Sequence, residues 1–145
     1  MRLRRDQAAG WSGPPTLGQS AAASAEGGLL GSWSATRWQY TSRHQAVQMV
    51  DVVCDLRGNV TLSLSQGTYV LAWDIPGNGS RSIGGFCAVG AEEIEFAAPG
   101  RDAVERVTFH LGTETLSLRC EASAWDFDGH GQEEPADFVA VFVKL

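Results

Sequence analysis

Apolar and polar residues alternate over short segments along most of the chain. The clearest case is residues 60–65, where Val, Leu and Leu alternate with Thr, Ser and Ser. This period of two is typical of a strand with one face buried. Turns rich in Gly, Pro and Asn separate the segments. We expect strands at residues 32–42, 46–55, 60–65, 68–74, 81–89, 92–97, 104–111, 115–125 and 137–145.

The pattern contains no segment with convincing helical periodicity. Residues 20–26 could form one helical turn, which we expect Gly27 and Gly28 to stop. The adjacent Gly84 and Gly85 predict a bulge or a sharp bend in their strand. Strands joined by tight turns, without intervening helices, favour an antiparallel meander. We therefore predict an all-β fold, in which a meander of about 8–10 strands closes into a barrel.

The chain length is that of a single domain, at 145 residues. Residues 1–28 are rich in Ala, Ser, Gly and Pro and show no periodicity, so we expect a flexible tail there. The barrel domain should then occupy residues 29–145. The hydrophobic fraction of 43% is sufficient for a buried core.

A short motif opens the first strand: Gly31, Ser32 and Trp33 follow two leucines. Together with the Gly-Thr-Tyr at residues 67–69 and the segment 125–136, it resembles the lipocalin-like (calycin) barrels, in particular small bacterial domains of that type. The resemblance spans residues 29–145. It implies that Trp33 packs across the closed end of the barrel, where the N-terminal segment crosses. It also implies that the barrel can hold a small hydrophobic molecule.

Large side chains at matching positions on several strands are the candidate ligand-binding residues. The interior of a barrel of about eight strands is filled by side chains or holds one small ligand. Aromatic rings inside it could thus line an apolar pocket or simply fill the space. The candidates are Arg37, Trp38, Tyr40, Tyr69, Leu71, Trp73, Phe86, Phe96 and Phe109.

The first strand leaves two arrangements open. If Trp33 points inward and the alternation is unbroken, Arg37 also points inward and needs an acidic ligand or a partner such as Asp51. If a bulge reverses the alternation, Trp38 and Tyr40 line the interior instead.

The formal net charge of −6 argues against nucleic-acid binding. No apolar run is long enough for a membrane helix, which excludes a membrane span of that kind. A basic start without a following apolar stretch predicts a cytoplasmic protein, or a secreted one if the start is mis-chosen. A small hydrophobic ligand is the expected partner, and a homodimer is a further option.

Neither a cofactor nor a metal is expected. The three Cys lack metal-ligand spacing with the three His, and we expect buried free thiols, with one disulfide as the alternative. His110 and His44 are expected to face solvent. The loop starting at Asp126 superficially matches a calcium loop, but Asp and Gly also supply ordinary turn geometry.

Three functions remain open on the sequence. The first is the binding of a small hydrophobic or amphipathic molecule inside the barrel. The second is an intracellular cyclase or isomerase that uses the same cavity, with Arg37, Tyr40, Tyr69 and His110 as the residues to test. The third is a filled barrel with a structural or interaction role.

Overall fold

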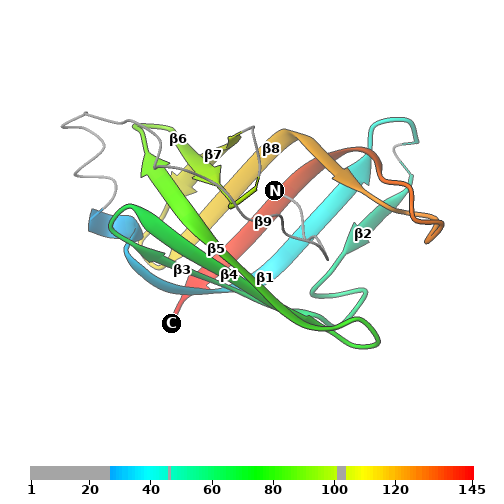
Figure 1. Ribbon diagram of the computed structural model, residues 1–145, viewed down its shortest axis with the longest axis horizontal. Helices are drawn as coiled ribbons and strands as arrows, with labels where there is room; N and C mark the ends of the chain where they lie inside the picture. The colour runs from blue at the N-terminus through cyan, green and yellow to red at the C-terminus, as the bar shows by residue number, and fades with distance from the viewer. Residues whose placement is uncertain (1–26, 46, 101–103) are drawn as a thin grey trace.

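The computed structural model describes residues 27–45, 47–100 and 104–145. All of the strands in this part of the chain belong to one antiparallel sheet that curls round on itself (Figure 1). The predicted flexible tail falls almost wholly on residues 1–26 and lies outside the described residues. The strands are β1 (Gly31–Ser42), β2 (Met49–Asp51), β3 (Asn59–Ser65), β4 (Thr68–Ile75), β5 (Gly79–Val89), β6 (Glu93–Ala97), β7 (Glu105–Leu111), β8 (Thr115–Trp125) and β9 (Glu134–Lys144).

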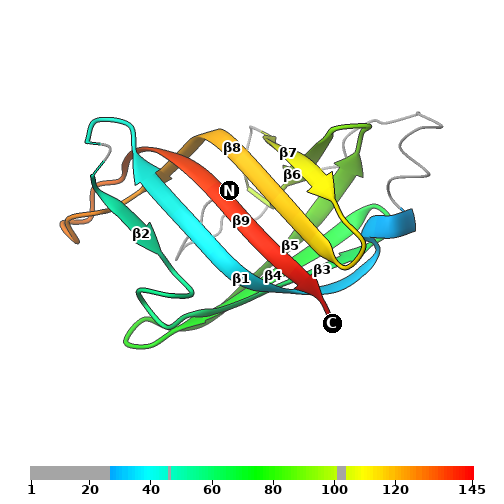
Figure 2. The ribbon, with the colours of Figure 1, turned by 180° about the vertical axis from the view of Figure 1, so that it is seen from behind.

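Pairing between the first and last strands closes the barrel. From β3 to β9 each strand lies beside its neighbour in the sequence, and β9 then pairs with β1 along nearly its whole length (Figures 1 and 2). Of the nine strands, β2 and β3 share the other side of β1, so the wall is eight strands round. The predicted all-β meander and its closure are confirmed.

The strand expected at residues 46–55 is mostly wrong. Only Met49–Asp51 forms a strand, and turns follow over residues 52–56. The Oδ1 atom of Asp51 accepts the backbone N–H groups of Val53 at 2.9 Å and Cys54 at 3.2 Å. A local side-chain acceptor of this kind draws the backbone away from the ladder and into a turn.

A β-bulge in β1 decides which of its side chains face the core. The register with β9 shifts between Ala35 and Arg37, so that one extra residue is inserted. As a result both Trp33 and Trp38 are buried, whereas Arg37 is exposed. The second of the two arrangements left open by the sequence is therefore the one observed.

The glycine pair in β5 does not form the predicted bulge. Its register with β4 runs without interruption through Val70↔Gly84 and Tyr69↔Gly85. Gly85 is needed for close approach, because a Cβ atom there would lie 2.3 Å from the Ala97 carbonyl oxygen and 3.1 Å from Cε1 of Tyr69. A bulge that the sequence did not predict occurs in β8, between Cys120 and Ser123.

One end of the barrel is held by contacts between the two ends of the domain. The indole Nε1 of Trp33 donates to the Leu29 carbonyl oxygen at 2.9 Å. The Lys144 ammonium lies 4.5 Å from the centre of the Trp33 ring and donates to the Leu30 carbonyl oxygen. Leu29 and Leu30 therefore lie beside Trp33 and Lys144 at this end of the barrel.

The helical turn expected at residues 20–26 lies outside the described residues, and Gly27 and Gly28, which were expected to stop it, are themselves helical. Glycines in a helix lose backbone entropy, and the burial of Leu29 (0% exposed) beside Trp33 favours the helical turn here.

The three cysteines are free thiols in the structure. Cys87 is buried and Cys120 is half-buried, as expected for apolar thiols. Cys54 is exposed, which contradicts the expectation for that residue, because it lies in the turn that Asp51 organises.

We predict that Gly85→Ala destabilises the fold by about 1–3 kcal/mol, because the added methyl group must displace backbone. The matched control is Gly84→Ala, whose Cβ would lie 3.3 Å from the Tyr69 carbonyl oxygen and requires only a small shift. Urea unfolding of both variants measures the difference. Equal stability of the two variants would contradict the close approach of β4, β5 and β6.

Candidate functional site

A chain of contacting aromatic rings runs along the inside of β1, β8 and β9. The Trp38 ring packs edge-on against Phe138 and Phe142, with centroids 4.7 and 6.1 Å apart. Tyr40 packs 5.5 Å from Phe138 and stacks on Trp125 at 4.7 Å, with 15° between the planes. These rings come from three adjacent strands, since β1 and β8 are the two neighbours of β9.

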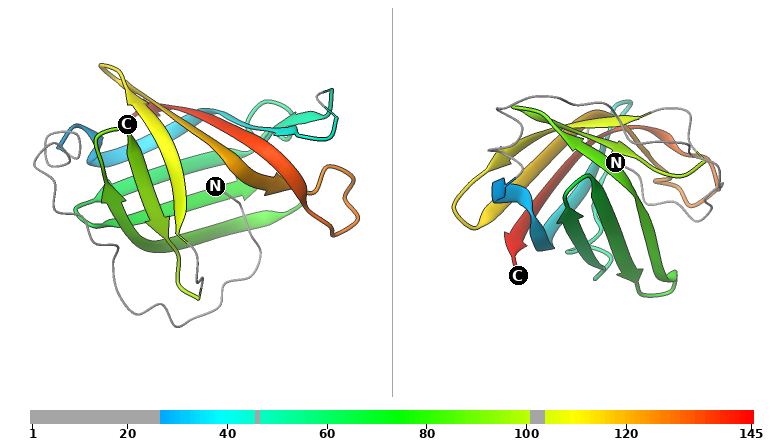
Figure 3. Two further views of the ribbon diagram at one scale, coloured as in Figure 1. Left: turned by 90° about the horizontal axis from the view of Figure 1, so that it is seen from above. Right: turned by 60° about the vertical axis from the view of Figure 1, so that its left-hand side comes forward.

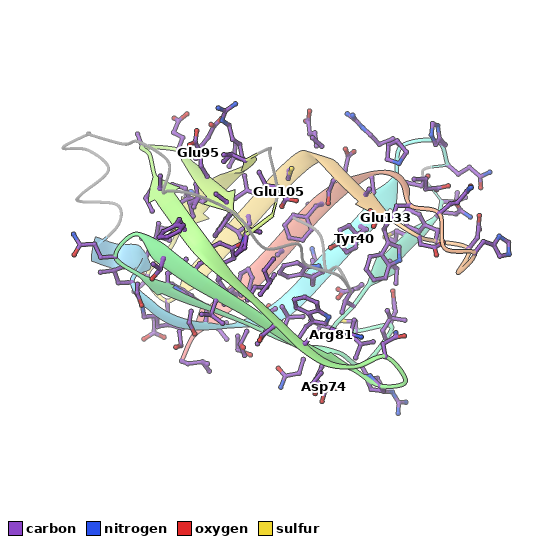
Figure 4. The ribbon with its side chains drawn as sticks, in the orientation of Figure 1. Tyr40, Asp74, Arg81, Glu95, Glu105 and Glu133 are labelled. Atoms are coloured by element: carbon purple, nitrogen blue, oxygen red, sulfur yellow. The ribbon has the colours of Figure 1, made fainter. Side chains whose placement is uncertain are left out.

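A hydrogen bond fixes the centre of this chain. The indole Nε1 of Trp38 donates to the Tyr40 hydroxyl oxygen at 2.9 Å, and both side chains are 0% exposed. A polar group that is buried needs such a partner, which explains how two polar-tipped rings can lie in an apolar interior. Figure 4 places Tyr40 inside the barrel, toward the end where the loop after β8 carries Glu133.

The chain of rings reaches the surface at Trp125. Trp125 and its near neighbour Phe127 are half-buried and pack against the core. They stand at the end of β8 and in the loop that follows it, at the end of the barrel away from the N-terminal helical turn (Figure 1).

A second group of predicted residues lies on the opposite wall. Tyr69 packs edge-on against Phe96 with centroids 4.8 Å apart. Leu71 and Trp73 follow Tyr69 on the inner face of β4, and all of these side chains are buried in the same core cluster.

The remaining three predicted candidates are less buried than these groups. Arg37 is exposed on the outside of β1, because the bulge turns it away from the core. Phe86 in β5 and Phe109 in β7 are half-buried, and Phe109 packs against the core. His44 and His110 are exposed, as expected.

Sequence reasoning missed three members of the ring chain, namely Trp125, Phe138 and Phe142. The sequence does contain a pattern that indicates Phe138 and Phe142. Apolar residues recur with a period of two in the last strand, at Ala136, Phe138, Ala140 and Phe142, and all four are buried in the structure. Their partners in β1 became evident only from the β1–β9 pairing.

The barrel wall is thin where the short strands β6 and β7 do not reach, which means that β5 and β8 have a partner on one side only there. β6 pairs with β5 only over residues 86–89, and β7 pairs with β8 only over residues 116–119. Within the described residues of the chain, residues 79–85 of β5 and 120–125 of β8 therefore each belong to a single ladder. Figure 3 shows β6 and β7 set toward the end opposite the β8–β9 loop.

The β8–β9 loop is held in shape by the carboxylate of Asp126. Its Oδ1 accepts the N–H groups of Gly129 at 2.9 Å and His130 at 3.2 Å, and its Oδ2 accepts that of Gly131 at 2.7 Å. These hydrogen bonds lower the pKa of Asp126 from its ordinary value of 3.8, and the bond from Gly131 has the largest effect. Both oxygens thus face the loop's own backbone, which favours turn geometry over a calcium loop.

Side chains of β1 and the residues after it anchor the same loop. The Ser42 hydroxyl is buried and donates to Oε1 of Glu134 at 2.7 Å, while its oxygen accepts the N–H groups of His44 and Gln45. Arg43 forms an ion pair with Asp137, with 3.1 Å between Nε and Oδ1. These contacts attach the β9 end of the loop to the barrel.

Asp51 is the one buried carboxylate of the described residues, and its role is structural. Besides the two turn N–H groups, its Oδ1 accepts the backbone N–H of Trp38 at 3.2 Å. Its negative charge, with a smaller contribution from Asp55, raises the pKa of the exposed Cys54 thiol. A raised pKa makes Cys54 a poor nucleophile near neutral pH.

No group of three or more His, Cys, Asp or Glu side chains suited to holding a metal ion occurs among residues 27–45, 47–100 and 104–145. In the same ranges, no helix has the length and apolar character to cross a membrane. No protein-family model matches the sequence, and neither a curated protein nor a solved structure is significantly similar to it.

We predict that the order of the β8–β9 loop depends on the ionisation of Asp126. Because its pKa is lowered in the folded protein, the stabilisation is present above pH 3.8 and is lost as the pH falls through the lowered value. NMR titration should show the Gly131 amide signal moving together with the Asp126 carboxyl carbon.

Asp126→Asn is the control. The amide oxygen can still accept the N–H groups of Gly129 and His130, but an NH₂ donor takes the place of the oxygen that accepts from Gly131. The Gly131 amide signal of this variant should not move over that pH range. In the unaltered protein, a titration midpoint of the Asp126 carboxyl above the ordinary pKa of 3.8 would contradict the loop structure.

Proposed function

We propose that the barrel binds a small hydrophobic or amphipathic molecule. The observation that carries the proposal is the chain of rings that begins with buried Trp38 and ends at half-buried Trp125. Large aromatic surfaces that lead from an interior to the solvent are typical of ligand sites, where a few polar groups fix orientation. The Tyr40 ring, whose hydroxyl accepts the Trp38 N–H, is the one that stacks on Trp125.

The thin region of the wall supports the same proposal. A ligand that enters a closed barrel must pass through its end or between separated strands. The stretches of β5 and β8 that belong to a single ladder lie on the same end as Trp125. Fewer ladder hydrogen bonds hold the wall here, so local opening costs less than elsewhere.

The likeness of the opening motif to lipocalin-like barrels agrees with a binding role. Trp33 begins β1, is 1% exposed and bonds to the N-terminal segment at the other end of the barrel. We infer a lipocalin-like arrangement, with that end closed and the Trp125 end used for the ligand. A homodimer stays a prediction.

The enzyme alternative gains less support. Of its four test residues, Arg37 and His110 are exposed and stand apart from the buried Tyr40 and Tyr69. General acid–base chemistry needs such groups within hydrogen-bond reach of one substrate. A filled barrel is the remaining alternative, and the following experiment separates it from a binding role.

We predict that protein purified without denaturation carries or accepts a small apolar ligand. Native mass spectrometry and solvent extraction should reveal a bound molecule. Titration with a library of hydrophobic compounds should change the emission of the buried Trp38 and half-buried Trp125. Compounds that bind should do so more weakly to Trp125→Ala. The absence of any bound mass, together with unchanged emission across the library, would favour the filled barrel.

A further inference from the structure

The end of the ring chain has a geometry that restricts which ligands it can take. Tyr40 covers one face of Trp125 in a nearly parallel stack, and Trp125 keeps some of its surface in solvent. We propose that Trp125 is a stacking platform for a flat aromatic ligand, and that it favours a cationic ligand over an anionic one. This inference rests on the proposed binding function and specifies its ligand class.

The platform is rigid before any ligand arrives. Tyr40 is completely buried and receives the Trp38 N–H, so its ring cannot rotate away from Trp125 without losing that bond. Trp125 itself pairs with Glu134 in the β8–β9 ladder. A preorganised ring loses little conformational entropy on binding, which favours stacking of a second flat ring.

The loop that follows adds a second ring at the same place. Phe127 packs against the core next to Asp126, whose carboxylate holds three backbone N–H groups of the loop. The Ser42–Glu134 hydrogen bond fixes the far end of the loop. Both rings are thereby kept at this end of the barrel, where they pack against the core.

The charged residues around Trp125 favour one sign of charge on the ligand. Between residues 120 and 136 the chain carries five carboxylates and neither Lys nor Arg. The nearest guanidinium among the residues that anchor the loop, that of Arg43, is engaged by Asp137. Aromatic faces attract cations, and surrounding carboxylates add to this attraction while they repel an anion. Asp128 and Glu133 are the exposed members of this set that lie inside the loop.

Three probes with one ring system test the inference: 9-aminoacridine, which is a cation at neutral pH, neutral acridine and the anion acridine-9-carboxylate. Isothermal titration calorimetry measures their affinities for the full chain. We expect 9-aminoacridine to bind about tenfold more tightly than the carboxylate at low salt, because the charge effect is electrostatic and partly screened.

Variants separate stacking from charge. Trp125→Leu should weaken the binding of 9-aminoacridine about tenfold, because stacking on an aromatic side chain is worth about that much or more. Trp125→Phe should restore most of the affinity. Asp128→Asn should reduce the difference in affinity between the cationic and the anionic probe. Glu114→Gln, in the turn before β8, should leave that difference in affinity unchanged. Far-UV circular dichroism checks that each variant is folded.

Two results would overturn the inference: equal affinity of the cation and the anion, or unchanged affinity in folded Trp125→Leu. If no acridine binds while other apolar compounds do, the inference is also overturned, but the proposed binding function stays intact. Failure of every compound would contradict both.

Discussion

The arrangement of the interior depends on one extra residue in β1. The bulge between Ala35 and Arg37 reverses the alternation of the strand, so that Trp33 faces the core in its first half and Trp38 does so in its second. Without it, an unbroken alternation would either bury Arg37 and turn Trp38 to solvent, or bury Trp38 and turn Trp33 to solvent. Burial of an unpaired guanidinium is far more costly than the local irregularity of a bulge.

The two halves of β1 consequently organise the two ends of the barrel. In the first half, Trp33 bonds to Leu29 and lies under Lys144, which joins the N-terminal segment to the last strand. In the second half, Trp38 and Tyr40 meet the rings of β9 and β8. The first end is therefore built for stability. The second combines aromatic surface, a loop held by hydrogen bonds and a stretch of wall with fewer ladder partners, on which the proposed binding role depends.

Much of the fold follows from local pattern, and the remainder depends on contacts between distant residues. Strands with clear alternation, such as β3 and β8, were predicted nearly to the residue because one face of each is buried. The expectation for β2 failed because the Asp51 carboxylate competes with the ladder for backbone N–H groups. Gly85 serves a close approach to Ala97, which no local pattern reveals.

The site was predictable to the same extent. Trp38 and Tyr40 were identified, but only as one of two arrangements, because a bulge leaves no clear mark in the sequence. Phe138 and Trp125 were missed since their importance comes from the pairing of the first strand with the last. Arg37 was included because alternation alone cannot locate the residue at which a strand changes face.

Cross-strand NMR distances between β1 and β9 test the central claim most directly. The structure predicts contacts of the Trp38 indole with the rings of Phe138 and Phe142, with Ala35 opposite Phe142 and Arg37 opposite Val141. The Trp38 indole N–H should also exchange slowly with solvent, because it is buried and bonded to Tyr40. An uninterrupted register with Thr36 opposite Val141, together with rapid exchange of that N–H, would contradict the account.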